Sequence, residues 1–181
     1  MGKLKRFVVV SAVVGVMIWL VAESAGITPA QNQARIMLAE LNQREGEVFR
    51  ENYAVRSGVS ALASGLLVEV LEKGKGQSPQ AGDWVKVHYR GQFIDGRDFD
   101  NSWRRQQPTT LAITDAIEGW QRVIPSMQVG DRVRLVVPPH LAYGQRGSGP
   151  VGPEQTLIFE IELLDVMVEE DALAGIVTQS S

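Results

Sequence analysis

Aromatic side chains recur beside single polar groups over the stretch Asp98–Tyr143 and in the strand-like segment before it. They fall in four short motifs: Val87-His88-Tyr89, Phe99-Asp100-Asn101-Ser102, Ile117-Glu118-Gly119-Trp120 and Ala142-Tyr143-Gly144. No strong nucleophile recurs with them. Aromatic walls with a few placed polar groups are typical of ligand pockets. The motifs therefore predict an apolar pocket that binds and reshapes a ligand and does not attack it.

The composition argues against several kinds of chemistry. The chain has no cysteine, which removes disulfides, thiolate nucleophiles and cysteine-ligated zinc. Its two histidines, His88 and His140, leave little from which to build a metal site, so we expect neither a metal nor another cofactor. The net charge of −3 and the absence of a basic stripe argue against nucleic-acid binding.

The N-terminus has the order of an export signal. Lys3, Lys5 and Arg6 precede the uncharged apolar segment Phe7–Ala22. At about 1.5 Å per residue this segment falls a little short of the ~30 Å hydrocarbon core of a bilayer. Two fates stay open for residues 1–25: cleavage as a signal peptide, or retention as an inner-membrane anchor. Either one predicts export across the cytoplasmic membrane and a periplasmic location.

A single helix is predicted within residues 28–58. Thr28, Pro29 and Gln31 form the pattern of a capping box at its start. Gly46 and two charged residues interrupt an otherwise apolar stripe made of Ala34, Met37, Leu41, Val48 and Val55. Two interpretations follow: a partly solvated stalk, or a helix for dimerisation or for cradling a substrate.

Alternating apolar and polar residues predict a set of strands in the second half of the chain. The segments are Leu66–Leu71, Trp84–Tyr89, Arg132–Val137 and Leu157–Leu163. In the last of them, Glu160 and Glu162 are expected to face outward. Clean alternation of this kind indicates antiparallel strands with one face exposed to water.

The fold class predicted from these segments is α+β. Ala116–Ile124 is the only strong helix pattern in this half, and Pro125 prevents much extension. We expect a half-open antiparallel β-sheet wrapped over this one short helix, preceded by the N-terminal signal or anchor and the stalk helix. The sheet domain is expected over residues 63–168, with a flexible tail over 169–181.

In their order along the chain, these motifs resemble the FKBP-type peptidyl-prolyl cis-trans isomerases. The resemblance runs through residues 63–167 without large gaps and rests on Val87–Gly91, Phe99–Ser102, Ile117–Trp120, Leu141–Gly144 and Thr156–Asp165. The segment upstream resembles the exported, Mip-type bacterial members, which carry a longer helical region that dimerises. Only one helix is predicted in the N-terminal region of this chain, so a homodimer stays an open question.

The resemblance implies an FKBP-like fold and a rotamase activity that accelerates rotation about X-Pro bonds in exported proteins as they fold. The residues that match the family's catalytic pocket are Tyr89, Phe99, Asp100, Ile117, Trp120, Tyr143 and Phe159. Arg105, Ala116 and Val151 match further substrate-binding residues of the family.

The resemblance also implies individual roles for some of these residues. Trp120 would form the floor beneath the proline ring, and the backbone N–H of Ile117 would hold a ligand carbonyl. Asp100 and Arg105 would form a polar pair that sets the hydroxyl of Tyr89.

The partners implied by the resemblance are proline-containing unfolded or partly folded polypeptides. Thr109, Leu111, Ala116 and Gly152 are smaller than, or different from, the usual family residues, which predicts a thinner pocket wall. We therefore expect a slower isomerase that binds the family's macrolide ligands weakly. The alternative function is a non-catalytic chaperone or adaptor that holds proline-containing segments in the same pocket.

Overall fold

A computed structural model of the chain describes residues 28–167. The predicted signal or anchor over residues 1–25 and the predicted tail over 169–181 lie outside the described residues. Within residues 28–167, no helix is both long enough and apolar enough to cross a bilayer. The chain divides into two compact units, residues 1–41 and residues 42–181.

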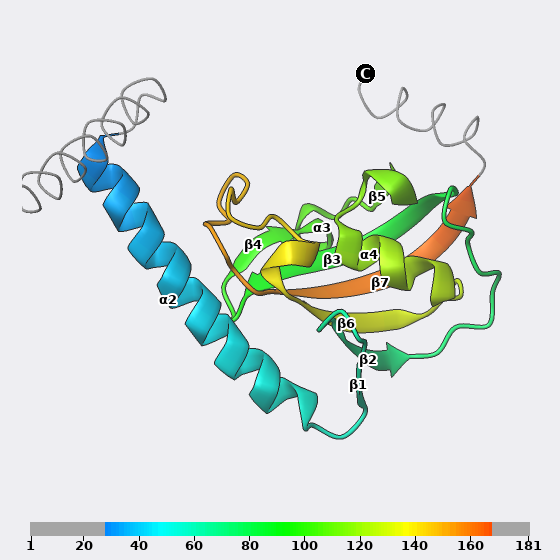
Figure 1. The fold of residues 1–181 in the computed structure, drawn as a ribbon. Coiled ribbons are helices and arrows are strands. Elements are labelled where there is room, and N and C mark those ends of the chain that lie inside the picture. Colours follow the sequence, from blue (N-terminus) through cyan, green and yellow to red (C-terminus); the bar gives the residue numbers. More distant parts are fainter. Residues whose placement is uncertain (1–27, 168–181) are drawn as a thin grey trace, which may run out of the picture. The chain divides into compact units, whose positions relative to one another are not determined.

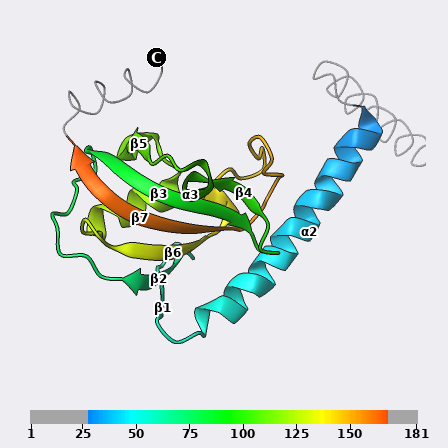
Figure 2. The same cartoon turned by 180° about the vertical axis from the view of Figure 1, so that it is seen from behind.

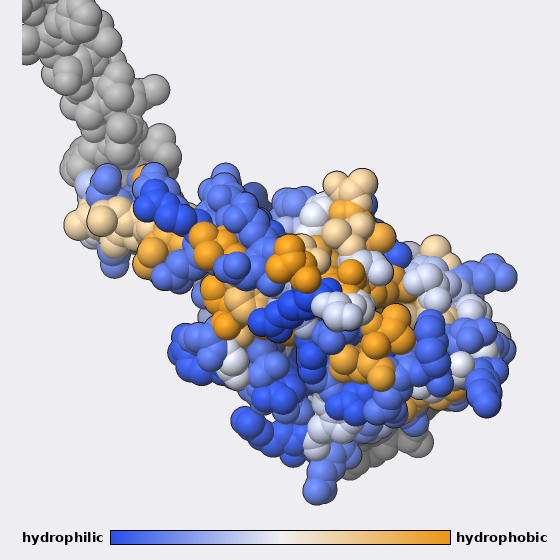
Figure 3. All heavy atoms as spheres, turned by 90° about the horizontal axis from the view of Figure 1, so that it is seen from below, coloured by the Kyte–Doolittle hydropathy of each residue, from blue (hydrophilic) through white to orange (hydrophobic). Residues whose placement is uncertain are grey.

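Helix α2 (Pro29–Ala54) begins with the predicted capping box. The N–H of Gln31 donates to Thr28 Oγ1 at 3.2 Å, and the N–H of Thr28 donates to Gln31 Oε1 at 2.8 Å. Each side chain thus satisfies a backbone group that the first turn leaves unpaired. In the first unit α2 carries exposed apolar side chains at Ile36, Met37, Leu38 and Leu41, and apolar patches interrupt its hydrophilic surface (Figure 3).

Seven antiparallel strands form one sheet in the second unit (Figure 1). They are β1 (Val59–Ala61), β2 (Leu67–Glu72), β3 (Trp84–Phe93), β4 (Asp98–Asn101), β5 (Thr109–Ala112), β6 (Arg132–Val137) and β7 (Leu157–Met167). Their order is β1-β2-β6-β7-β3-β4, and β5 also pairs with β3. The predicted α+β class with a half-open antiparallel sheet is therefore confirmed.

Strand β3 is the strand on which the second unit is organised. It pairs along its whole length with β7, from Trp84 opposite Met167 to Phe93 opposite Leu157 (Figure 2). Its other edge is shared, because β5 pairs with its first half and β4 with its second half. This edge of β3 is therefore not covered by one continuous strand, because β5 and β4 pair with separate halves of it.

Short helices connect these strands. Helix α3 (Ser102–Arg105) follows β4, and helix α4 (Glu118–Val123) covers one face of the sheet (Figure 1). Single 3₁₀ turns lie at η1 (Ile113–Asp115), η2 (Ile124–Ser126) and η3 (Pro139–Leu141). The helix expected over Ala116–Ile124 is thus shorter than predicted, and it tightens into the η2 turn, which contains Pro125.

The main core lies between the inner face of the sheet and α4. Val85 and Val87 of β3, Leu135 of β6 and Ile161 of β7 are each 0% exposed there. Lys86 separates the two valines, and Glu160 and Glu162 flank Ile161, so the predicted alternation places its apolar face inward in these strands. Trp120 joins this core from α4.

A second, smaller core lies on the outer face of the sheet, beneath the last turns of α2. Tyr53 is 4% exposed and packs in a cluster with Leu67 of β2 and Val136 of β6. Gly46 is buried on the same helix face, since a Cβ there would collide with Thr156 Oγ1. The glycine that weakened the predicted helix therefore lets α2 pack closely against Thr156, the residue preceding β7.

Glu160 of β7 lies on the outer face as expected, but it is only 8% exposed. Arg132 donates to it through Nε at 2.7 Å, and Arg134 donates through Nη2 at 3.4 Å. The two arginines come from β6, which is the neighbouring strand, and they cover the carboxylate. A buried charge is tolerated where such partners surround it.

Candidate functional site

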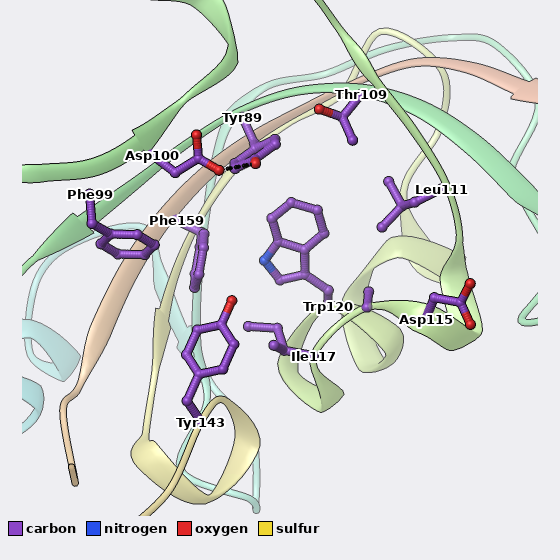
Figure 4. A pocket seen from close by; sticks show the side chains of 11 residues that line it. Tyr89, Phe99, Asp100, Thr109, Leu111, Asp115, Ile117, Trp120, Tyr143 and Phe159 are labelled. Carbon is purple, nitrogen blue, oxygen red and sulfur yellow. Dashed lines mark hydrogen bonds between the residues drawn. The ribbon is translucent and has the colours of Figure 1, made fainter. Parts of the chain in front are cut away.

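A cavity of about 250 Å³ opens between the inner face of the sheet and the start of α4 (Figure 4). Its lining comes from β3, β4, β5, β7, η1, α4 and two loops, which are distant in the sequence. The lining residues are Tyr89, Phe99, Asp100, Thr109, Leu111, Asp115, Ala116, Ile117, Trp120, Tyr143 and Phe159. Each of the four aromatic sequence motifs contributes at least one of them.

Four aromatic rings support one another edge-on around the cavity. Trp120 is 5% exposed, and its ring lies 5.2 Å from Tyr89 at 77° and 5.4 Å from Phe159 at 87°. Phe99 lies 5.7 Å from Phe159 at 88°. Aromatic pairs favour this edge-to-face geometry. Each ring therefore restrains its neighbour, and the cavity has a preformed apolar wall.

Gly91 makes room for this arrangement. A Cβ at Gly91 of β3 would collide with the ring of Phe99 and would crowd Phe159. Only a glycine lets the ring of Phe99 lie across the strand at this point.

A polar trio stands at one end of the cavity. The hydroxyl of Tyr89 donates to Asp100 Oδ2, and Arg105 forms an ion pair with Asp100 Oδ1. Arg105 Nη2 also lies 3.5 Å from the hydroxyl oxygen of Tyr89. The hydroxyl of Tyr89 is thus committed to Asp100, and the charge of Asp100 is balanced by Arg105.

The local sequence explains why the side chain of Arg105 reaches back to the carboxylate of Asp100. Asn101 caps α3, and its Oδ1 accepts a hydrogen bond from the N–H of Arg104 at 3.1 Å. Asparagine is a favoured residue at this position because it satisfies a free N–H of the first turn. The single turn of α3 then brings the arginine side chain back over the end of β4.

The environment of the trio shifts two pKa values in opposite directions. Burial raises the pKa of Tyr89, and its hydrogen bond to Asp100 raises it further. Burial alone would raise the pKa of Asp100, but the hydrogen bonds from Tyr89 and Arg105 and the charge of Arg105 outweigh it, so the pKa lies below its usual value. Near neutral pH the trio therefore consists of a neutral phenol, a carboxylate and a guanidinium.

Three hydrogen-bond donors at the cavity have no partner within the part of the chain that the structure describes. They are the backbone N–H of Ile117, the hydroxyl of Tyr143 and the indole N–H of Trp120. In Figure 4 the hydroxyl of Tyr143 points into the cavity, toward the indole. The indole N–H of Trp120 is buried, and buried donors in proteins are normally paired. Ile117 and Tyr143 are partly exposed, and a ligand that supplies acceptors could pair with all three groups.

Ser102 lies behind the cavity and binds the backbone N–H and carbonyl of Tyr89. The sequence motifs assigned no role to Ser102. Ser102 is fully buried, and its Oγ accepts from the N–H of Tyr89 at 2.8 Å and donates to the carbonyl of Tyr89 at 3.1 Å. It also lies 2.9 Å from His88 Nδ1. Ser102 therefore fixes the backbone from which the Tyr89 ring projects.

The structure brings together most of the residues predicted for the site. Eight of them line the cavity: Tyr89, Phe99, Asp100, Ala116, Ile117, Trp120, Tyr143 and Phe159. Arg105 does not line it, but it contacts two lining residues, Asp100 and Tyr89. Val151 is 5% exposed and belongs to the main core, so the structure does not place it at the cavity wall.

Thr109, Leu111 and Asp115 complete the wall. The first two depart from the family pattern in the sequence, whereas no sequence motif pointed to Asp115. Its position two residues before Ile117 was the only sequence signal that could have pointed to it. Among residues 28–167, no group of histidine, aspartate and glutamate side chains is arranged to hold a metal ion.

A half-open antiparallel sheet over a short helix, with an aromatic cavity between them, defines an FKBP-like domain. The family model described as "FKBP-type peptidyl-prolyl cis-trans isomerase" matches residues 75–164. Together with the relatives below, this match shows that the chain belongs to the FKBP-type peptidyl-prolyl cis-trans isomerase family.

Two curated relatives illustrate the similarity. The FKBP-type peptidyl-prolyl cis-trans isomerase FkpA of Escherichia coli is 41% identical over 125 residues, which cover 69% of this chain and 46% of FkpA. The peptidyl-prolyl cis-trans isomerase Mip of Coxiella burnetii is 40% identical over 126 residues, which cover 69% of this chain and 55% of Mip. The chain thus spans about half the length of these relatives.

Solved structures share the fold over more of their own length. The crystal structure of FkpA from Escherichia coli matches with a TM-score of 0.70 and 31% identity, over 85% of this chain and 81% of that chain. A peptidyl-prolyl cis-trans isomerase from Pseudomonas syringae matches with a TM-score of 0.65 and 36% identity, over 71% of this chain and 95% of that chain.

Proposed function

We propose that this chain is a peptidyl-prolyl cis-trans isomerase that accelerates rotation about X-Pro bonds in unfolded or partly folded polypeptides. One observation carries the proposal. The cavity has an indole floor, an aromatic wall and unpaired donors at Ile117 and Tyr143, and no serine, cysteine, lysine or histidine is among its lining residues. Family membership supports the same activity.

The reaction explains why such a cavity needs no nucleophile. Rotation about an X-Pro bond is opposed by the partial double-bond character of the amide, and the barrier is about 18–20 kcal/mol. No covalent bond is made or broken during the rotation. A catalyst must therefore bind the twisted amide more tightly than either planar isomer.

The cavity favours the twisted amide through its polarity. Twisting removes amide conjugation, so the carbonyl of the twisted bond is less polar than that of the planar bond and loses less on leaving water. An aromatic wall that excludes water then stabilises the twisted state relative to the planar one. We assign to Trp120 the surface on which the proline ring rests, with Phe99, Tyr89 and Phe159 as the wall.

The unpaired donors hold the peptide while the bond turns. We assign to the Ile117 N–H and the Tyr143 hydroxyl the role of donating to carbonyl oxygens of the substrate. Fixing the chain on both sides of the proline leaves rotation about the X-Pro bond as the motion that relieves strain. Each tenfold gain in rate requires only about 1.4 kcal/mol of preference for the twisted state, which is the scale of a single good hydrogen bond.

The proposal is tested with the full chain and a Phe-Pro peptide whose cis and trans forms exchange slowly. Exchange NMR measures the catalysed rate for the wild type and for the double variant Tyr89→Phe/Asp100→Leu. We expect the wild type to accelerate exchange and the double variant to lose at least tenfold in kcat/KM. The matched control is Tyr53→Phe/Glu69→Leu, which alters an equivalent pair on the outer face and should keep the wild-type rate per folded molecule.

Two results decide between the functions weighed for this pocket. If the wild type does not accelerate exchange above the uncatalysed rate, catalysis is excluded. If such an inactive wild type still binds the peptide with micromolar affinity, the chain acts as a non-catalytic chaperone or adaptor. Circular dichroism of each variant separates loss of function from loss of fold.

We also propose that the chain is exported, with residues 28–58 and 63–168 as the helical region and the isomerase domain. The basic residues before the apolar segment Phe7–Ala22 support export. N-terminal sequencing of the chain from membrane and soluble fractions tests this. A start near residue 25 in the soluble fraction would indicate a cleaved signal, and an intact start in the membrane fraction would indicate an anchor. An intact chain in the cytosol would contradict both.

A further inference from the structure

Asp115 gives the cavity a carboxylate that nothing in the described chain neutralises. It lies in the η1 turn, lines the cavity beside Leu111 and Ala116, and is solvent-exposed. Within residues 28–167 its side chain takes part in no hydrogen bond and no ion pair. In Figure 4 it lies on the far side of the Trp120 indole from Asp100.

The other carboxylates near the cavity are balanced. Asp100 accepts from the Tyr89 hydroxyl and pairs with Arg105. Glu118 does not line the cavity, and its carboxylate pairs with Arg122 one turn along α4. Asp115 is therefore the acidic group whose charge a bound peptide would meet.

The cavity wall beside Asp115 consists of short, mainly apolar side chains. Thr109 and Leu111 project from β5 at this end of the cavity. A lysine or arginine side chain of a peptide can lay its methylene stem on such a surface while its charged head reaches the carboxylate. A glutamate or aspartate at the same place would meet like charge.

We propose that Asp115 determines substrate specificity, by favouring proline-containing segments with Lys or Arg close to the proline and disfavouring those with Asp or Glu. This inference rests on the proposed function of the cavity as a prolyl-peptide site. Since Asp115 is exposed, an ion pair there is worth up to about 1 kcal/mol, which corresponds to a preference of about fivefold. The preference is screened by salt.

The experiment uses the full chain and a series of peptides built around one Phe-Pro core. In each peptide a single position, from two before to two after the proline, carries Lys, Gln or Glu. Chemical-shift titration of the protein yields the Kd of each peptide, and exchange NMR yields kcat/KM. At one or more positions we expect Lys to bind about fivefold more tightly than Gln, and Glu more weakly than Gln.

The variant Asp115→Asn keeps the shape of the side chain and removes its charge. We expect it to bring the Lys-to-Gln affinity ratio close to one, and Asp115→Lys to reverse the order of Lys and Glu. The matched control Glu118→Gln changes the net charge by the same amount three residues away and should keep the wild-type ratio. In about 1 M salt, where the Debye length is about 3 Å, the wild-type ratio should also fall toward one.

The outcomes separate this inference from the proposed function. Equal affinities for Lys and Gln peptides at every position overturn the role of Asp115, even if the chain is an active isomerase. A preference that Glu118→Gln abolishes as fully as Asp115→Asn overturns it too, since the effect would then come from the overall field. A preference in Kd without any catalysed exchange supports the role of Asp115 and overturns the isomerase.

Discussion

Two tyrosines on opposite faces of the same sheet are held by the same kind of polar trio. On the inner face Tyr89 donates to Asp100, which pairs with Arg105. On the outer face Tyr53 donates to Glu69 Oε2 at 2.6 Å, and Arg134 Nη1 lies 3.1 Å from the same carboxylate oxygen.

The two trios also behave alike electrostatically. Burial raises the pKa of Tyr53, and the hydrogen bond to Glu69 raises it further. The same two causes, in the same order, raise the pKa of Tyr89. Both phenols are thus kept neutral as hydrogen-bond donors well into the alkaline range.

What differs is the space in front of each ring. Tyr53 is 4% exposed and packs against Leu67 and Val136, so its face of the sheet is closed. Tyr89 faces a cavity of about 250 Å³. Each trio therefore fixes a tyrosine side chain, but only the inner trio leaves room for a ligand. We call Tyr53, Glu69 and Arg134 the closed trio, and Tyr89, Asp100 and Arg105 the open trio.

The largest expected effect is on the closed trio. Tyr53→Ala removes a buried aromatic ring that joins α2 to the sheet, and we expect it to lower the free energy of unfolding by about 3–5 kcal/mol. Urea denaturation followed by circular dichroism measures this loss. The proposed isomerase activity per folded molecule should stay within about twofold of wild type, because the cavity lies on the other face.

Val48→Ala serves as the control for that substitution. Val48 is on the same helix but 53% exposed, so its truncation should cost less than about 0.5 kcal/mol. If Tyr53→Ala were equally mild, the outer trio would not secure the helix, and the contrast between a closed and an open trio would fail.

A smaller pair of changes tests the two hydroxyls directly. Tyr89→Phe and Tyr53→Phe each delete one hydrogen bond to a carboxylate, and each should destabilise the fold by about 1–2 kcal/mol. Only Tyr89→Phe should lower kcat/KM, by roughly tenfold, because it frees a ring and a carboxylate that line the cavity. Measuring both variants with one peptide is the check, and equal activities would show that the open trio has no part in catalysis.

Several features of the fold were predictable from the sequence because the patterns that indicate them are local. Alternation in Trp84–Tyr89 identified the inward face of β3, and the capping box of α2 involves residues only three apart. Alternation and capping depend on neighbours in the chain, which the sequence displays directly. The aromatic residues of the cavity are distant in the sequence, and their grouping was predicted from the resemblance to the FKBP family.

The closed trio was not predicted, because its contacts join distant residues. The apolar stripe predicted for α2 includes Met37, Leu41 and Val48, yet all three are exposed. In the second unit α2 is buried through Gly46 and Tyr53 instead. No local pattern indicates that Tyr53 will meet Glu69 or that a glycine will allow contact with Thr156.

The same reason explains the other differences between expectation and structure. The sequence pattern predicts that Glu160 faces outward into solvent. The arginines that cover it come from the neighbouring strand β6, which no local pattern indicates. Val151 matches a family position by sequence, whereas its packing places it in the main core. Asp115 is recognisable as a cavity residue only after β5 and η1 are placed beside Trp120.

The smallest expected effect concerns the acid stability of the open trio. The pKa of Asp100 lies below its usual value although burial opposes this, because Tyr89 and Arg105 donate to it and Arg105 adds a positive charge. A folded-state pKa below the unfolded value of about 3.9 stabilises the fold above that pH, and this contribution is lost as the pH falls through the folded-state pKa.

Arg105→Gln removes the charge that lowers this pKa. The side chains of Arg105 and Asp100 are 45% and 35% exposed, so we expect a loss of only about 0.5 kcal/mol near pH 6. The difference between variant and wild type should shrink below about pH 4, where Asp100 becomes protonated in the variant first and then in the wild type. Urea denaturation from pH 6 to pH 3 measures it, with Arg122→Gln at the exposed Glu118 pair as control. A difference that stays constant across this range would show that Arg105 acts by packing alone, and the electrostatic likeness of the two trios would then have to be abandoned.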